Sequence, residues 1–293
     1  MGSAEPWQDF DWRNELVLST KKQIERFCNT VMEIKDAGGE PHDIDRWLAS
    51  RLQAHIARTT ETLDNFQTRQ ALQEAYFGIE TDLKWYRRRL PKDCDGSRGL
   101  RELCSVWIRL LSPFIPFTTE HLWKEMAGEG LVSFAPWPVA DPALMNPKAE
   151  LAEELLARTV EDVESIEKLI QITPKAVTIA LAPAWKHEIF QTIAAASDRN
   201  TVVKEIMKDP AMRKRGRDAT DAAKQITTLI HRLPPSVIGP LVQDPISEKD
   251  VFDSAKDFLE QEFGVPVHIV EAEGSGLLKA STALPFKPAI VIE

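Results

Sequence analysis

Lysines and arginines gather in two short tracts of this 293-residue chain. Residues 84–101 hold seven basic and two acidic side chains, and residues 199–217 hold the same numbers. Each tract therefore has a local charge of seven minus two, or +5, within a chain whose net charge is −9. Clustered cations of this kind can neutralise the phosphates of a polyanion even on an acidic protein. The alternative, in which each tract is a solvated helix end, stays open.

Residues that usually carry catalysis or bind metal form no recognisable motif. The three cysteines, Cys28, Cys94 and Cys104, are odd in number and show no CxxC spacing, which disfavours a disulfide framework or a thiolate zinc site. The six histidines include no HExxH pair, and the chain has neither a Walker loop nor a GxSxG elbow. We therefore expect no catalytic site, cofactor or metal in this chain by itself.

Apolar residues repeat at helical spacing through the first half of the chain, every three or four residues. The helices that we expect span residues 24–34, 44–63, 72–90 and 100–110. Gly38-Gly39 ends the first of them, and a Gly- and Asp-rich loop at 93–99 precedes the last. Four amphipathic helices with narrow apolar stripes predict an antiparallel bundle.

The second half of the chain has a different residue pattern, with β-prone runs between predicted helices. A Gly- and Pro-rich stretch, 128–145, predicts a boundary between two domains, 1–145 and 146–293, in line with about 150 residues per domain. Asn146 as N-cap and Pro147 in the first turn open an acidic connector helix that runs to about residue 171. β-prone runs predict strands at 176–182, 265–270 and 289–292, with helices near 184–196, 202–207, 219–231 and 249–263. The expected fold class is α+β overall, an antiparallel helical bundle followed by a small α+β domain.

Nothing in the chain indicates a membrane or an export route. No apolar run approaches the ~20 residues of a membrane helix, and the first residues lack the pattern of a secretory signal. Unpaired cysteines are typical of a reducing compartment. We therefore expect a cytoplasmic protein with no membrane partner.

The segment Ser112–Trp123, SPFIPFTTEHLW, has the marks of one helix ending and another beginning. Pro113 ends the first helix because proline lacks an amide donor and clashes with the preceding turn. Pro116 and Thr118 open the second helix. Thr118 suits its N-cap, and Phe117 and Leu122 stand at the two positions of a hydrophobic staple.

With Trp137-Pro138, Asp45–Leu52 (DRWLASRL) and Trp85-Tyr86, this segment resembles the anticodon-binding helical bundle of class I aminoacyl-tRNA synthetases for large aliphatic amino acids. The two nucleotide-binding motifs of those enzymes, in the HIGH and KMSKS style, are both missing. The resemblance is therefore to part of such an enzyme without its catalytic domain.

The second half narrows the resemblance. Residues 208–216 (KDPAMRKRG) and 283–293 (ALPFKPAIVIE) resemble the C-terminal domain of archaeal-type leucyl-tRNA synthetases. Trp12-Arg13 and Ile24–Phe27 fit the same family. The resemblance implies a C-terminal fragment that comprises the anticodon-binding bundle and the C-terminal tRNA-binding domain.

That family implies a role for each domain. Its members grip the tRNA body and the long variable arm, and the partners implied are leucine tRNA and the catalytic and editing domains of the same enzyme. ATP and Mg²⁺ would belong to the full-length ligase and not to this chain. The expected phosphate contacts are Lys84, Arg87, Arg88 and Arg89 on the bundle, and Arg213, Lys214, Arg215 and Arg217 on the second domain. Backbone groups of Ile292 and the carboxylates of Glu293 would hydrogen-bond base edges at the tip of the variable arm.

Two other interpretations stay open. The first half resembles valyl- and isoleucyl-tRNA synthetases equally, so the chain could be the equivalent fragment of one of those. It could also be a protein-interaction bundle that never touches RNA, with basic tracts that serve solubility. A preference for tRNAs with long variable arms would favour the leucyl fragment over a valyl or isoleucyl one. Salt-dependent tRNA binding would favour a tRNA-binding fragment over a protein-interaction bundle.

Overall fold

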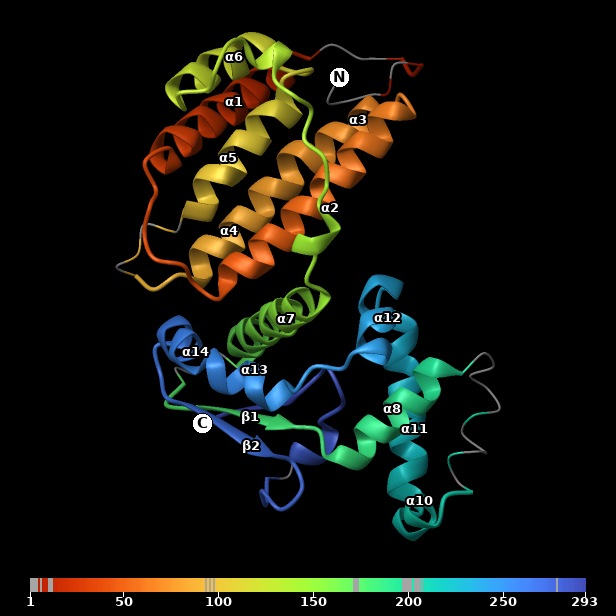
Figure 1. The fold of residues 1–293 in the computed structure, drawn as a ribbon. Coiled ribbons are helices and arrows are strands. Elements are labelled where there is room, and N and C mark those ends of the chain that lie inside the picture. The colour runs from red at the N-terminus through yellow and green to blue at the C-terminus, as the bar shows by residue number, and fades with distance from the viewer. Residues whose placement is uncertain are drawn as a thin grey trace. The chain divides into compact units, whose positions relative to one another are not determined.

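The computed structural model describes residues 5, 7–9, 13–92, 94, 96, 98–170, 174–196, 202, 206, 208–277 and 279–293. The chain divides into two compact units, Met1–Ala149 and Glu150–Glu293 (Figure 1). The division falls in the first turn of a long helix, four residues after the predicted boundary at residue 145. The fold is α+β, as predicted, and helices make up most of it.

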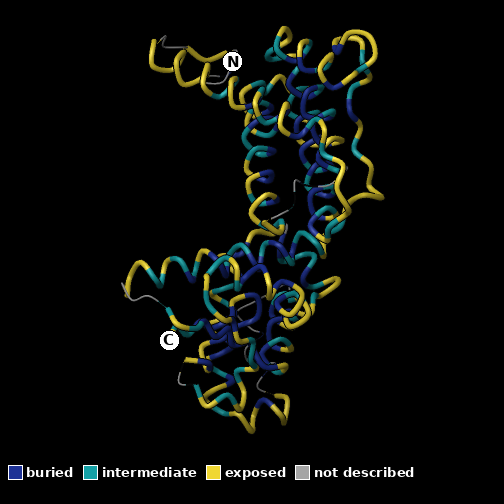
Figure 2. Tube along the Cα trace, turned by 90° about the vertical axis from the view of Figure 1, so that its left-hand side faces the viewer, coloured by how far each residue is buried: buried dark blue, intermediate teal, exposed yellow. Residues whose placement is uncertain are grey.

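A helical bundle forms the first unit (Figure 1). Its α-helices are α1 (Asn14–Ile34), α2 (Ile44–Asp64), α3 (Thr68–Leu72), α4 (Ile79–Arg89), α5 (Arg98–Leu111) and α6 (Pro116–Glu125). Short 3-10 turns follow at η2 (Val132–Phe134) and η3 (Pro142–Leu144). The apolar stripes of α1, α2, α4 and α5 meet in one core, where the Phe27 and Trp107 ring centroids lie 4.7 Å apart. Figure 2 shows the buried residues along these helices, whereas the first turns of α1 are exposed.

The helix predicted over residues 72–90 is interrupted by a π-helical segment, η1 (Gln73–Gly78), between α3 and α4. His55 of α2 approaches the backbone at this place. A Cβ atom added at Gly78 would lie 2.5 Å from Cε1 of His55, so only glycine leaves room for the ring. π-Helical turns commonly mark such insertions into a helix.

The Gly- and Pro-rich stretch that we expected to mark the domain boundary, with Asn146 directly after it, lies against α2. Its backbone N–H groups at Asp141 and Asn146 donate to Gln53 Oε1 at 2.9 Å and to Ser50 Oγ at 2.7 Å. Nε1 of Trp137 donates to a third side chain of α2, the Thr60 hydroxyl, at 2.9 Å. The stretch therefore belongs to the first unit.

Helix α6 begins earlier than predicted. Pro116 is its first residue, the N-cap position is Ile115, and no side chain caps the helix. Thr118 is thus inside the helix, and Phe117 is 91% exposed and forms no staple. A proline with its fixed φ in the first helical position sets the start in place of the threonine cap.

The long acidic helix α7 (Pro147–Ile170) begins where predicted. Asn146 Oδ1 accepts a hydrogen bond from the Ala149 N–H at 3.0 Å, which is the expected N-cap bond. Its apolar face is buried through Leu151, Leu155 and Val163. The predicted end at residue 171 lies outside the described residues.

The second unit is built on a three-stranded sheet in the order β2-β1-β3. The strands are β1 (Val177–Leu181), β2 (Val267–Glu271) and β3 (Ala289–Ile292), close to the three predicted runs. The central strand β1 is parallel to β2 and antiparallel to β3, and all five of its residues are buried. β3 is therefore an edge strand.

Helices pack on this sheet and beside it (Figure 1). They are α8 (Ala184–Ala195), α10 (Pro210–Arg215), α11 (Arg217–Arg232), α12 (Pro235–Gln243), α13 (Glu248–Ser254) and α14 (Lys256–Phe263). The single helix predicted over 249–263 is broken at Ala255, and α10 and α12 were not predicted. The helix predicted over 202–207 lies largely outside the described residues.

Candidate nucleic-acid interface

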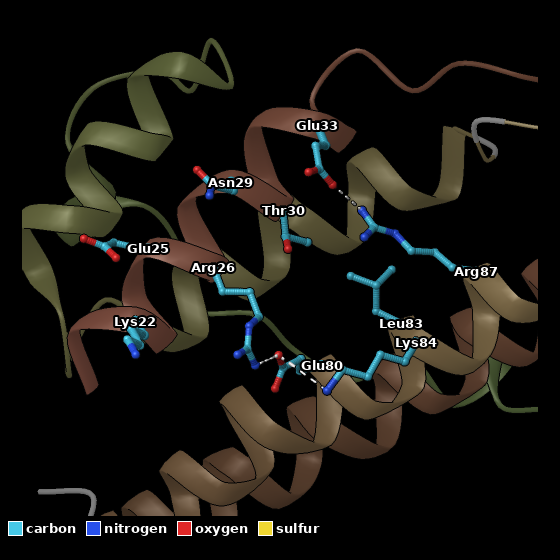
Figure 3. A pocket seen from close by; sticks show the side chains of 10 residues that line it. All are labelled: Lys22, Glu25, Arg26, Asn29, Thr30, Glu33, Glu80, Leu83, Lys84 and Arg87. Atoms are coloured by element: carbon cyan, nitrogen blue, oxygen red, sulfur yellow. Dashed lines mark hydrogen bonds and ion pairs between the residues drawn. The ribbon is translucent and has the colours of Figure 1, made fainter. Parts of the chain in front are cut away.

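Two of the predicted phosphate contacts, Lys84 and Arg87, line a groove of about 480 Å³ between α1 and α4. Figure 3 shows that side chains from both helices point into it. Glu80 Oε1 accepts from Arg26 Nη1 at 3.0 Å and lies 3.6 Å from Lys84 Nζ. Arg87 Nη2 pairs with Glu33 Oε2 at 3.0 Å. The groove thus brings the predicted cations together and partly neutralises them.

The other two predicted residues of this tract lie in the last turn of α4, with Arg87. Arg88 is exposed, with its guanidinium carbon 6.0 Å from the centroid of the Trp85 ring, whereas Arg89 is half-buried. Three consecutive arginines at a helix C-terminus complement the negative end of the helix dipole. Lys84, Arg87 and Arg88 share one face because helical residues three and four apart are neighbours.

The second basic tract forms a tight elbow between two helices. Gly216 links α10 directly to α11 with φ +54° and ψ −115°, a conformation that favours glycine. Asp209 caps α10 by accepting from the Ala211 N–H at 2.7 Å. Near the bend lie Arg213 and Lys214, both exposed and without an ion pair among the described residues. Arg217, with its side chain 92% exposed, lies 3.5 Å from Asp221.

Arg215 differs from its neighbours in the tract because its guanidinium group contacts two other side chains. Its guanidinium carbon lies 4.7 Å from the centroid of the Trp185 ring on α8, and its Nη1 pairs with Glu273 Oε1 at 3.0 Å. These contacts hold Arg215 within the second unit. No local sequence signal could have indicated them, because Trp185 and Glu273 are distant in the chain.

The predicted tail residues Ile292 and Glu293 lie at the end of the edge strand. The Glu293 N–H donates to Ala176 O at 3.0 Å, and Val177 stands opposite Ile292. Hydrogen-bonded and non-hydrogen-bonded pairs alternate along an antiparallel ladder. The backbone N–H and C=O of Ile292 therefore point away from β1, whereas the Glu293 backbone bonds to Lys175 and Ala176, which directly precede β1.

One charged cluster that the sequence did not indicate is buried in the bundle. His55 Nε2 lies 2.8 Å from Asp82 Oδ2, His55 Nδ1 lies 3.3 Å from Glu74 Oε2, and Arg51 Nε donates to Asp82 at 2.8 Å. Burial opposes the charge on His55, but its hydrogen bonds with the two carboxylates outweigh this and raise its pKa. With His55 only 3% exposed, the cluster lies inside the bundle and ties α2 to η1 and α4.

Neither a metal cluster nor a membrane helix occurs in the part of the chain that the structure describes. Among those residues, no three side chains of His, Cys, Asp or Glu gather as a metal site would require. None of the described helices combines the length and apolar character needed to cross a membrane.

Comparison with known proteins finds similarity to tRNA ligases. Residues 45–182 match the family model of the anticodon-binding domain of tRNA ligase. Over its whole length the chain is similar to the leucine–tRNA ligases of Methanothrix thermoacetophila (35% identity, 31% of that protein), Pyrococcus abyssi (35%, 30%) and Pyrococcus furiosus (36%, 30%). It thus spans about a third of the length of these relatives.

Among solved structures, a LeuRS–tRNA–LeuAMS ternary complex from Agrobacterium radiobacter K84 aligns with 71% of this chain and 24% of that one. The sequence identity is 17% and the TM-score 0.41, which is too low to establish a shared arrangement.

Proposed function

The chain belongs to the archaeal-type leucine–tRNA ligase family and corresponds to a segment of its members. From that premise we propose that it is a tRNA-binding part of such an enzyme. It would dock the body and the long variable arm of leucine tRNA for leucylation by a catalytic domain outside this chain. The observation that carries the proposal is the similarity to leucine–tRNA ligases across both units, at 35% identity over 100% of the chain. The match to an anticodon-binding domain supports it for residues 45–182.

The geometry suggests that the two units bind different parts of the tRNA. The cations of α4 and of the α1–α4 groove suit the phosphates of a folded tRNA body, because phosphate contacts position a protein without reading sequence. The elbow at Gly216 adds Arg213 and Lys214, which have no ion pair among the described residues. The outward-facing backbone of Ile292 offers one donor and one acceptor, which suit base edges in an unpaired RNA tip.

Other components of the reaction belong to the remaining two thirds of such a ligase. ATP and Mg²⁺ would bind the catalytic domain, and an editing domain would complete the enzyme. A cytoplasmic location follows from the same proposal.

The test is tRNA binding by the purified chain at several salt concentrations. If about five phosphates are neutralised, the logarithm of affinity should fall against the logarithm of salt concentration with a slope of about −3.5 to −4.5. A slope near zero would instead support the protein-interaction bundle. Equal affinity for a leucine tRNA and for a valine or isoleucine tRNA with a short variable arm would show that the chain does not select tRNA by its variable arm.

A further inference from the structure

The segment that leads into the edge strand β3 has an unusual conformation. After a 3-10 turn, η4 (Ala280–Thr282), Leu284 and Lys287 exchange two backbone hydrogen bonds of 2.9 Å each. Between them Phe286 has φ +61°, a left-handed conformation that is uncommon for a bulky residue. Phe286 is also buried, with only 3% of the residue exposed. Such a backbone persists only where its surroundings fix it.

Lys186 of α8 fixes one end of this segment. Its Nζ donates to Ser281 O and to Ala283 O, each at 2.7 Å, and the residue is only 5% exposed. Burial lowers the pKa of this amine. A buried ammonium group is tolerated only when hydrogen bonds replace its water, and here two backbone carbonyls do so.

Glu248 of α13 fixes the other end. Its Oε1 accepts from the N–H of Phe286 at 2.6 Å, and the residue is 7% exposed. His187 Nε2 lies 3.8 Å from the same oxygen. Oε2 is buried without a hydrogen-bond partner in the described part of the chain. One hydrogen bond to a strained backbone N–H is thus the main polar contact of a nearly fully buried carboxyl group.

The two anchors stand close to both RNA-facing parts of the second unit. β3 begins at Ala289, three residues after Phe286. Trp185, the neighbour of Lys186, stacks on Arg215 of the elbow. Consecutive residues of α8 therefore hold the elbow on one side and the segment before β3 on the other.

We propose that Lys186 and Glu248 are positioning residues, which together form a tail clamp that holds residues 280–288 so that β3 and the elbow meet the same tRNA. This inference rests on the proposed function, because it assigns the clamp to the recognition of the variable arm. Fixing the segment in advance removes the ordering cost that tRNA binding would otherwise have to meet.

The test uses the whole chain with three substitutions. Lys186→Met and Glu248→Met remove the anchoring hydrogen bonds at similar side-chain length, whereas Glu248→Gln keeps an acceptor for the Phe286 N–H. Hydrogen exchange is followed by mass spectrometry on peptides from residues 280–293, with peptides from α11 as a control for the fold. Affinity is measured for a leucine tRNA transcript and for the same transcript with its variable arm shortened.

We expect both methionine variants to raise exchange in residues 280–293 but not in α11. Each should weaken binding of leucine tRNA about tenfold, because the freed segment must then be ordered when the tRNA binds. Affinity for the shortened transcript should stay unchanged, and Glu248→Gln should bind both transcripts as tightly as the wild type does.

Several results would overturn the clamp. One is faster exchange with unchanged affinity for both transcripts. Another is an equal loss for both transcripts, and a third is a Glu248→Gln variant as weak as Glu248→Met. If the Lys186→Met variant also loosens α11, the comparison of the two Glu248 variants decides. Failure of the wild-type chain to bind either transcript would refute the proposed function itself, whereas failure of the clamp alone leaves wild-type binding intact.

Discussion

The two basic tracts differ in which of their cations are paired, although each tract has a local charge of +5 in the sequence. In the first unit, Lys84 and Arg87 share the α1–α4 groove with Glu80 and Glu33, which pair with them. In the second unit, Arg213 and its neighbour Lys214 stand exposed without an ion pair among the described residues. Local charge therefore does not measure how much cation is available to a phosphate.

The buried charges show the same contrast. In the bundle, His55 has a carboxylate at each ring nitrogen, and Asp82 also accepts from Arg51. In the second unit, Glu248 has one backbone donor and a buried oxygen without a partner in the described part of the chain. The His55 cluster is thus paired on every side, whereas Glu248 is not, so the larger response to substitution should come from Glu248.

The largest effect is expected on stability, from Glu248→Gln. Burial raises the pKa of Glu248 from 4.5 to about 7, so the folded chain holds a proton that the unfolded chain releases. The free energy of unfolding should therefore fall as the pH rises from about 4.5 to about 7, by roughly 3 kcal/mol in total. Glutamine cannot ionise, so the variant should lack this fall and exceed the wild type in stability at pH 8.

Urea unfolding of both proteins at pH 5 and pH 8 measures this difference. Taking variant minus wild type cancels the contribution of His55, whose raised pKa also removes stability as the pH rises. An identical pH dependence of the free energy of unfolding in the two proteins would show that folding does not raise the pKa of Glu248.

The next largest effect is expected at the elbow. Reversing both charges, Arg213→Glu with Lys214→Glu, should weaken tRNA binding about 30-fold and make the salt slope shallower by about 1 for each phosphate that is no longer neutralised. The matched control is Lys249→Glu with Lys256→Glu, which changes the net charge equally on α13 and α14, where both lysines already pair with acids. Equal losses in the two double variants would mean that total charge, and not the elbow, determines affinity.

A smaller effect, of opposite sign, is expected in the α1–α4 groove. Glu80→Gln releases Arg26 and Lys84 from a shared carboxylate, so tRNA affinity should rise about threefold with a steeper salt slope. The gain is modest because exposed ion pairs are worth only about 0–1 kcal/mol. Glu61→Gln on α2 makes the same change of charge outside the groove and should have no effect. Weaker binding by Glu80→Gln would show that the pair orders the groove instead of masking it.

Local patterns predicted much of this fold. β-Prone runs predicted all three strands, and the Asn146-Pro147 cap predicted the start of α7, because such signals act within a few residues. The start of α6 was predicted wrongly because Pro116 and Thr118 competed for it. The π-helical segment η1 could not be predicted, since it accommodates His55 from another helix.

The candidate site was predictable only in part. The basic residues are visible in the sequence, as is the carboxylate of Glu80 four residues before Lys84. The pairing of Arg87 with Glu33 is not visible, because 54 residues separate them. Contact of any of these residues with tRNA stays a prediction, and so does contact through Ile292 and Glu293.

The smallest effect on binding is expected from Arg215, although the sequence places it in the middle of the basic tract. Its guanidinium group already stacks on Trp185 and pairs with Glu273, so it has little freedom to reach a phosphate. Arg215→Ala should therefore change tRNA affinity by less than about twofold, while removal of the cation–π interaction destabilises the second unit by about 0.5–1 kcal/mol. Filter binding and urea unfolding of this variant, compared with Arg213→Ala, separate the two roles. A loss of affinity as large as that of Arg213→Ala, with unchanged stability, would show that Arg215 leaves Trp185 to bind RNA, and the contrast between the neighbouring arginines would then be wrong.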